Sequence, residues 1–330
     1  MSIRMAQLGI GHDHASGKAQ VMKQSGEVEL AGIFEPSERM REMYGGRPSY
    51  EGVRWFTSLE EVLTDSSITA VAAEGRVSEN LAYAQAALEH DKHVWLDKPA
   101  GDDLDLFRDL LDLAARSKLH LQLGYMFRYN SGFQLIFELA HSGKLGTVRS
   151  VRAHMSSGGS GEPKETWDSD GERSGGFMFV LSGHVIDAVV TLLGRPGDVT
   201  PFSQSKGEEI PWDCKNTLAV LEYPEALAVV ECSIREVGAS GLRAFEVFGT
   251  RGTAILQPLE PPEIRLCFDV DRDGYSAGWQ TVPVDKRQRY VESLRAFVAT
   301  LRGEQPPDRS FEHELAVQET VLAAAGLRRT

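Results

Sequence analysis

The most constraining feature of the chain is an alternation of short apolar runs with amphipathic helical stretches over residues 3–123. Such alternation is typical of repeated βαβ units, so it predicts an α/β domain with a doubly wound parallel sheet. From hydrophobic spacing we expect strands at 4–10, 28–34, 53–56, 68–73, 93–96 and 119–123. We expect helices at about 15–25, 37–44, 59–64, 79–90 and 104–117.

The pattern changes after Tyr125, where strand-like runs follow one another with hairpin signals between them. This predicts an α+β domain around a large, mainly antiparallel open sheet. We expect strands at 148–155, 217–223, 227–234, 244–248, 253–256 and 264–268. We expect helices at about 131–142, 183–193, 287–302 and 311–326.

Length predicts two domains, because 330 residues exceed the roughly 250–300 at which a single core stops growing. We place a nucleotide-binding domain at 1–125 and a second domain at 126–330, whose last helix is a candidate to pack back on the first. A long polar loop at 156–174 carries Trp167. Loops of this length are usually functional lids or disordered, and the tryptophan favours a lid over a ligand.

Composition excludes several classes of protein. The net charge is −13, with lysines and arginines dispersed among acids, so nucleic acid is not an expected partner. The chain has no run of about 18 apolar residues, so no membrane span is expected. Three widely spaced cysteines, Cys214, Cys232 and Cys267, indicate neither a disulfide framework nor a zinc site. With a strand pattern beginning almost at once and no export signal, we expect a cytoplasmic protein.

A glycine-containing turn follows the first predicted strand and precedes a helix. Gly9 and Gly11 match the first two glycines of a dinucleotide fingerprint, in which the backbone approaches a pyrophosphate at a helix N-terminus. His14 replaces the third glycine. An ordinary glycine turn is the simpler alternative. His12 and His14 could also be metal ligands, but no acidic cluster accompanies them, so we predict no metal.

Glu35 ends the second predicted strand, about two dozen residues beyond the first glycine. A carboxylate there accepts hydrogen bonds from adenosine ribose hydroxyls and repels a 2′-phosphate, which favours NAD over NADP. The alternative is a solvated acid at the end of a strand. Arg39 lies one helical turn further, so NADP stays an alternative cofactor.

Two residues are candidates for acid–base chemistry. Lys98 follows the apolar run 93–96, and ligands of open α/β sheets lie outside the carboxyl ends of the strands. His184 lies in the first turn of a predicted helix capped by Ser182, where the dipole favours a neutral imidazole that can act as a general base. The alternatives are a surface lysine and a core histidine. Asp187 shares the helix face of His184 and could orient it or cap the helix.

Two segments carry a family resemblance. Residues 87–99, ALEHDKHVWLDKP, resemble A-L-x-x-G-K-H-V-x-x-E-K-P, with Asp97 in place of glutamate. Further on, Trp167-Asp168, Gly175-Gly176 and His184-Val185-Ile186-Asp187 resemble a W…GGG…D-x-G-x-H-x-x-D block. Over its whole length the chain resembles the glucose–fructose oxidoreductase, inositol dehydrogenase and rhizopine-catabolism family (Gfo/Idh/MocA).

The resemblance implies a Rossmann domain, a second domain whose open sheet forms a homodimer or homotetramer, bound NAD or NADP, and oxidation of a CH–OH group in a sugar, polyol or related compound. It implies that Lys98 polarises the reacting hydroxyl and that His184 removes its proton. The expected cofactor residues are Gly9, Gly11, His12, His14, Glu35, Gly75, Asp97 and Lys98. The expected substrate residues are Lys98, Arg128, Tyr129, Trp167, His184 and Asp187.

Three departures from the family pattern cluster around this site. Val180 stands where the family has an aspartate four positions before the histidine, Gly75-Arg76-Val77 replaces T-P-N, and His14 replaces a glycine. Because valine can neither relay a proton nor hydrogen-bond a hydroxyl, two alternatives stay open. One is a glycosidase or lyase that uses NAD transiently. The other is a sugar- or nucleotide-binding protein without turnover.

Overall fold

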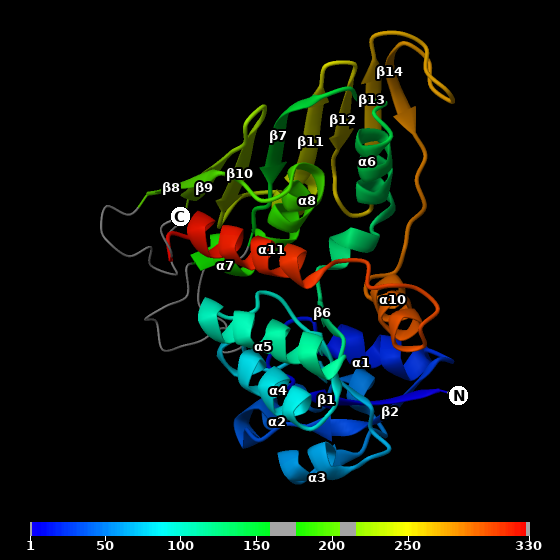
Figure 1. Cartoon of the computed structure of the whole chain (residues 1–330), viewed down its shortest axis with the longest axis vertical. Coiled ribbons are helices and arrows are strands. Elements are labelled where there is room, and N and C mark those ends of the chain that lie inside the picture. The colour runs from blue at the N-terminus through cyan, green and yellow to red at the C-terminus, as the bar shows by residue number, and fades with distance from the viewer. Residues whose placement is uncertain (1, 159–175, 205–215, 328–330) are drawn as a thin grey trace. The chain divides into compact units, whose positions relative to one another are not determined.

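A computed structural model describes residues 2–158, 176–204 and 216–327 of the chain, and contacts divide it into two compact units (Figure 1). Among the described residues, the first unit comprises 2–124 and 288–315, and the second comprises 125–158, 176–204, 216–287 and 316–327. Trp167 and most of the predicted lid loop lie outside the described residues.

The first unit contains a six-stranded sheet of order β3-β2-β1-β4-β5-β6, in which every neighbouring pair is parallel. The strand order reverses between β1 and β4, which is the switch point where such sheets bind ligands. The predicted doubly wound sheet is therefore confirmed. Its strands are β1 (Ile3–Leu8), β2 (Val28–Phe34), β3 (Trp55–Phe56), β4 (Ala70–Ala73), β5 (His93–Leu96) and β6 (Leu121–Leu123).

Helices flank this sheet and bury their apolar sides against it. The helix α10 comes from the C-terminal part of the chain and packs beside α1 (Figure 1). Its Phe297 stacks on the buried Trp95 of β5, with ring centroids 6.3 Å apart. The helices are α1 (Ala15–Gln24), α2 (Glu38–Tyr44), α3 (Leu59–Thr64), α4 (Val77–Glu89), α5 (Leu104–Ser117) and α10 (Val291–Leu301), with a short 3-10 helix η1 (Pro48–Tyr50).

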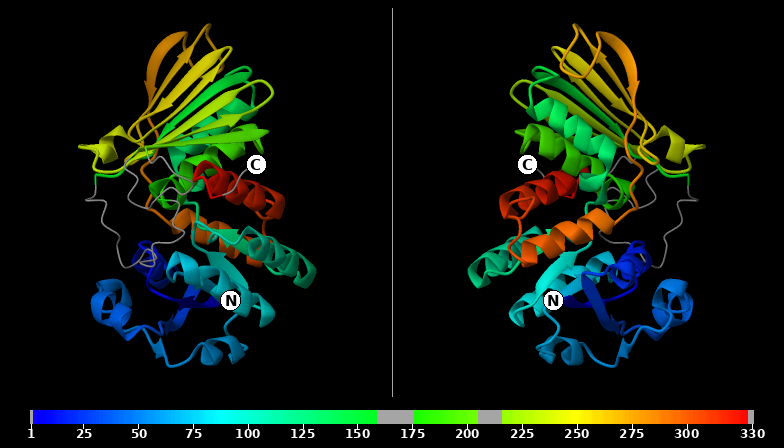
Figure 2. Two further views of the ribbon diagram at one scale, coloured as in Figure 1. Left: turned by 90° about the vertical axis from the view of Figure 1, so that its left-hand side faces the viewer. Right: turned by 90° about the vertical axis from the view of Figure 1, so that its right-hand side faces the viewer.

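The second unit is built on an eight-stranded sheet of order β14-β13-β12-β11-β7-β10-β9-β8. Only the β7–β10 pair is parallel, which confirms the mainly antiparallel sheet. The helices α6 and α8 cover one face of it (Figure 2). The strands are β7 (Val148–His154), β8 (Asp198–Ser203), β9 (Asn216–Glu222), β10 (Leu227–Ser233), β11 (Ala244–Gly249), β12 (Gly252–Leu256), β13 (Ile264–Phe268) and β14 (Gly278–Val282).

The helical segments that accompany this sheet are η2 (Met126–Tyr129), α6 (Ser131–His141), α7 (Gly176–Val180), α8 (Gly183–Leu193), α9 (Ala239–Leu242) and α11 (Phe311–Ala324). Hairpins form where the turn residues predicted them, including the two-residue loop of Thr250 and Arg251 between β11 and β12. Two strands, β8 and β14, were not expected. Both lie at the edges of the sheet, and β8 contains Pro201 while β14 begins at Gly278, residues that are disfavoured inside strands.

Candidate functional site

The predicted glycine turn begins immediately after β1. Gly9 has φ +83°, and its N–H donates to Phe34 O over 2.7 Å. A Cβ at Gly9 would lie 2.4 Å from Gly75 Cα, and one at Gly11 would lie 2.9 Å from Arg76 N. These glycines therefore allow the turn after β1 to pack directly on the turn after β4. The structure thus brings Gly9, Gly11 and Gly75 together at the switch point.

The N-terminus of α1 suits an anionic group. His14 precedes the helix without a side-chain capping hydrogen bond, and the first turn contains no acidic residue. Backbone N–H groups at such an end, together with the helix dipole, favour a phosphate. The turn and the helix start therefore fit the diphosphate of a dinucleotide.

Glu35 follows β2 and lies buried beside the glycine turn. Its Oε2 accepts a hydrogen bond from Ile10 N at 2.9 Å and its Oε1 accepts one from Ser37 N at 2.8 Å. Burial raises the pKa of the Glu35 carboxyl, and the two backbone hydrogen bonds oppose that rise. Each carboxylate oxygen has a second lone pair, so Glu35 retains the capacity to accept from a ribose hydroxyl.

Lys98 lies at the carboxyl end of β5 and is only 5% exposed. Its backbone N–H donates to Asp97 Oδ1 at 2.7 Å, and its carbonyl oxygen lies 3.1 Å from His12 Nε2. Because His12 Nδ1 accepts from His14 N at 3.2 Å, we assign the ring proton of His12 to Nε2. Burial lowers the pKa of His12 to about 3, so this imidazole is neutral.

The Lys98 ammonium has a shifted pKa. Burial is the main cause of the lowering and Lys18 adds to it, whereas Asp97 and Asp13 oppose it. A lowered pKa makes loss of the ammonium proton easier, so Lys98 can donate a hydrogen bond and also take part in proton transfer.

A buried ion cluster lies beneath Lys98, and it was missed in the sequence. Lys18 Nζ lies 2.5 Å from Glu74 Oε1 and 3.1 Å from Asp97 Oδ2, with all three side chains 0% exposed. The ammonium also lies 4.2 Å from the centre of the Trp95 ring. One signal was available, because Lys18 falls on the buried side of α1 with Ala15, Ala19 and Met22. Helical spacing therefore pointed this lysine inward.

His14 joins the cluster through Asp97. Its Nδ1 lies 3.1 Å from Asp97 Oδ1 and 3.2 Å from Oδ2. The Tyr290 ring lies 5.4 Å from the His14 ring and rests on Gly17, where a Cβ would come within 2.6 Å of it. Tyr290 has φ +69°, an uncommon backbone conformation for a residue other than glycine. It is a further residue beside the predicted cofactor side that the sequence did not reveal.

The same cluster contains three potential metal-ligand atoms, from His12, His14 and Asp97, within 4.8 Å of one another. Their hydrogen bonds already account for their arrangement, and the Lys18 ammonium contacts Asp97 directly. A divalent cation would have to displace that ammonium or lie beside it, at a cost in charge repulsion. The absence of a metal therefore stays our prediction.

In the second unit, His184 lies in the first turn of α8 and is 2% exposed. The ring of Tyr125 lies 5.9 Å away in an edge arrangement, and that of Phe127 lies 5.0 Å away. The predicted capping role of Ser182 is wrong, because its backbone is helical and its side chain makes no capping hydrogen bond. The preceding helix α7 ends only three residues before Gly183, so the chain arrives at α8 already helical.

Arg128 and Asp187 form a buried ion pair. Arg128 Nη2 lies 2.8 Å from Asp187 Oδ1, and Nε donates to both carboxylate oxygens at 3.1 and 3.0 Å. The pair joins η2 to α8 and thereby fixes Phe127 beside His184. Tyr129, the next residue, is half-buried.

The predicted site residues thus form two groups, each within one unit. The predicted cofactor residues and Lys98 lie at the carboxyl ends of the strands of the first sheet. Around η2 and α8 lie Arg128, Tyr129, His184 and Asp187. Val180, the departure from the family pattern, is the last residue of α7. Trp167 lies outside the described residues.

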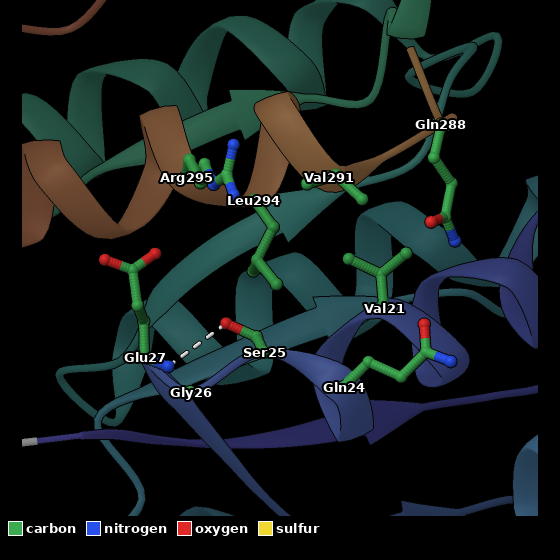
Figure 3. Close-up of a pocket in the computed structure, with 9 residues that line it drawn as sticks. All are labelled: Val21, Gln24, Ser25, Gly26, Glu27, Gln288, Val291, Leu294 and Arg295. Carbon is green, nitrogen blue, oxygen red and sulfur yellow. Dashed lines mark hydrogen bonds between the residues drawn. The ribbon is translucent and has the colours of Figure 1, made fainter.

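The first unit also has a pocket of about 430 Å³, lined by the end of α1 and the start of α10 (Figure 3). Val21, Glu27, Leu294 and Arg295 are among its lining residues. Because β2 starts directly after Glu27, the pocket lies at the amino end of the strands, opposite the glycine turn. No predicted site residue lines it.

A parallel sheet with a glycine turn at its switch point, followed by an α+β unit with a large sheet, is typical of two-domain proteins that bind a dinucleotide. Comparison with known proteins narrows this class. Residues 3–125 match the oxidoreductase family with an NAD-binding Rossmann fold. Residues 133–255 match the GFO/IDH/MocA C-terminal domain. The chain therefore belongs to the Gfo/Idh/MocA family of oxidoreductases and its first domain binds NAD, as the sequence predicted.

Individual relatives are distant. An uncharacterised oxidoreductase of Schizosaccharomyces pombe is 26% identical over 290 residues, which cover 83% of this chain and 78% of the relative. Inositol 2-dehydrogenase 3 of Saccharopolyspora erythraea is 28% identical over 151 residues, 44% of this chain and 43% of its own. A levoglucosan dehydrogenase solved with NADH and levoglucosan has a TM-score of 0.79 at 15% identity, covering 98% of this chain and 97% of the other, which shows a shared fold.

No helix in the described parts of the chain combines the length and apolar character needed to cross a membrane.

Proposed function

We propose that the protein transfers a hydride between NAD and a CH–OH group of a sugar, polyol or sugar-derived compound. The observation that carries this proposal is the buried Lys98 at the carboxyl end of β5, held beside the glycine turn through His12 and Asp97. Relatives named inositol 2-dehydrogenase and glucose-6-phosphate 3-dehydrogenase support the substrate class.

Lys98 and His184 divide the acid–base work in this proposal. Bound NAD supplies the hydride acceptor. The Lys98 ammonium donates a hydrogen bond to the reacting oxygen and stabilises negative charge that develops there. His184, held by aromatic neighbours, accepts the hydroxyl proton. The Val180 side chain offers no polar atom, so in this proposal the two residues act without the aspartate of the family pattern.

The remaining predicted residues hold the two ligands. Gly9, Gly11, His12, His14 and Gly75 shape the diphosphate side, with Asp97 behind them.

On the substrate side, Arg128 and Asp187 fix η2 and α8 through their ion pair. We assign substrate contacts to Tyr129 and Trp167. Arg128 and Asp187 shape the substrate side through the elements they join.

Glu35 makes NAD the preferred cofactor over NADP. Its carboxylate is held at the end of β2 by Ile10 N and Ser37 N, so it cannot swing aside for a 2′-phosphate without losing two hydrogen bonds. A negative charge at that point accepts from ribose hydroxyls and repels an added phosphate.

The second sheet also leaves apolar side chains uncovered. Phe202, Leu227 and Trp279 are each more than half exposed within the described chain. Exposed apolar surface of this kind is typical of association sites. We propose a homodimer or homotetramer formed through this sheet, which light scattering of the purified protein tests directly.

The decisive test of the proposed reaction is incubation of the protein with NAD and a panel of sugars and polyols, followed by NADH absorbance. Lys98→Met should lower kcat/KM for the best substrate by about 10²–10⁴-fold, because a positioned acid–base group contributes that much. Lys118→Met removes an exposed lysine elsewhere on the same unit and is the matched control.

An unchanged rate in Lys98→Met would contradict the proposed mechanism. Product without net NADH would instead support transient use of NAD in a glycosidase or lyase reaction. Binding of NAD and a sugar without any turnover would support a binding protein.

A further inference from the structure

The side chain of Lys18 is fully buried, although it belongs to a helix that flanks the sheet of the first unit. Lysines are rarely fully buried unless they are paired, and this one is 0% exposed between two carboxylates and an indole ring. The cluster lies one residue from Lys98, at the end of β5 and under the start of α1. No family motif quoted above includes Lys18 or Glu74.

Glu74 and Asp97 share one direct ammonium contact, that of Lys18. Two carboxylates held against one ammonium leave excess negative charge within the cluster, which is costly in a low-dielectric interior, and protonation of one carboxyl removes that excess. Burial and the neighbouring Asp97 hold the pKa of Glu74 well above its usual range. Burial raises the pKa of Asp97, but Lys18 and the hydrogen bond from His14 hold it well below its usual range. These opposite directions favour Glu74 as the carboxyl that holds the proton.

The hydrogen bonding agrees with this charge state. Glu74 Oε2 is buried, and within the described chain no donor faces it. A protonated Glu74 resolves this, because its O–H can donate to Asp97. The cluster is then a Lys18 cation, an Asp97 anion and a neutral Glu74.

Asp97 connects the cluster to Lys98 and His14. One of its oxygens accepts from the backbone N–H of Lys98 at 2.7 Å, and both lie within 3.2 Å of His14 Nδ1. The orientation of Asp97 thus decides where the Lys98 main chain and the His14 ring lie. Lys18 holds Asp97 from the opposite side, at 3.1 Å.

We propose that Lys18 is a positioning residue for the cofactor side of the active site, acting through Asp97 on Lys98 and His14, with neutral Glu74 completing the cluster. This inference rests on the proposed function, because it takes Lys98 and His14 to lie at the bound nucleotide. Lys18 itself touches neither cofactor nor substrate in this proposal.

The test removes Lys18 together with the acid that it contacts, so that Asp97 is the cluster member whose charge is retained. Lys18→Met with Glu74→Gln keeps the volume of both side chains and is compared with Glu74→Gln alone. Lys23→Met, which removes an exposed lysine from the same helix, is the matched control. NADH affinity is measured by fluorescence titration, and the His14 pKa by NMR of the ring, assigned with His14→Gln.

The double variant should bind NADH at least tenfold more weakly. The His14 pKa should rise, because burial, Lys18 and Lys98 depress it while Asp97 raises it, and the double variant removes Lys18. His12 and Tyr290 also face His14, and both are retained. Glu74→Gln should show much smaller changes. A folded double variant with unchanged NADH affinity and an unchanged His14 pKa would overturn the inference.

Infrared spectroscopy of the wild-type protein supplies a measurement that does not depend on folding of the double variant. At neutral pH a protonated buried carboxyl band should be present and should disappear in Glu74→Gln. Its absence from the wild-type spectrum would also overturn the inference. Neither readout requires turnover. A shifted His14 pKa without any dehydrogenase activity would support the role of Lys18 and reject the proposed reaction.

Discussion

The two units hold their predicted catalytic residues in opposite ways. Lys98 lies over a polar, charged cluster in which every side chain is fixed by hydrogen bonds and ion pairs. His184 lies among aromatic rings, and the buried ion pair of Arg128 with Asp187 secures η2 and α8 around it.

The difference shows which physical interactions control the charge of Lys98 and the position of His184. In the first unit, the charge of Lys98 depends on burial and Lys18, which lower its pKa, balanced against Asp97 and Asp13, which raise it. Changes of neighbouring charge should therefore alter its chemistry. In the second unit, position depends on packing and on one buried ion pair, so changes there should first alter stability.

The largest effect on stability should come from Arg128→Met. It leaves Asp187 buried without its cation, and breaking a buried pair in this way costs about 3–5 kcal/mol. Chemical denaturation of the purified protein measures the change. Adding Asp187→Leu should recover much of the loss, because the uncompensated charge is removed as well. Arg149→Met, which removes an exposed ion pair with Glu225, should change stability little.

Equal stability of Arg128→Met and the double variant would show that the ion pair does not hold this region together. The comparison between the two units would then lose its basis, because packing alone would secure His184.

A smaller effect is expected from Glu35→Gln in the first unit. The change keeps the shape and one accepting oxygen, so one of the two charge-assisted hydrogen bonds from Ile10 N and Ser37 N is lost, at a cost of about 1.5–3 kcal/mol. NAD affinity should fall about tenfold or more, while NADP affinity should fall less or rise. Titration with both cofactors tests this. An unchanged ratio of the NAD and NADP affinities would show that Glu35 does not select between the two cofactors.

The smallest effect is expected in the pH dependence of stability of Glu74→Gln. This comparison tests the charge of Glu74 directly. The pKa of Glu74 is raised in the folded protein above its usual 4.5. Stability from the neutral acid is therefore fully present below about pH 4.5 and is lost as pH rises through the raised value. Glutamine cannot ionise, so the variant should gain stability relative to wild type as pH rises. Urea unfolding at several pH values measures the difference, and a constant difference would contradict a protonated Glu74.

Much of this protein was predictable from local sequence patterns. The alternation over 3–123 predicted the doubly wound sheet, because hydrophobic periodicity reports which face of each element is buried. The glycines at 9 and 11 and the position of Lys98 after a buried run predicted the edge of the sheet where these residues meet. The assignment of substrate residues stays a prediction.

What could not be predicted depends on contacts between distant segments. Strands β8 and β14 form at the sheet edges despite a proline and a glycine, because neighbouring strands supply their hydrogen bonds. Arg128 and Asp187 each looked available for substrate, yet they pair across 59 positions. Ser182 looked like a helix cap, but α7 brings the chain in already helical.

By itself, the sequence determined the fold class, the family and the end of the first sheet at which the predicted cofactor residues meet, because these follow from periodicity and from short motifs whose residues are near neighbours along the chain. Only the tertiary structure decided which charged groups surround Lys98. Lys18 comes from α1, and Glu74 and Asp97 follow β4 and β5, so the shifts of their pKa values depend on burial and on distances of about 3 Å that no linear spacing encodes.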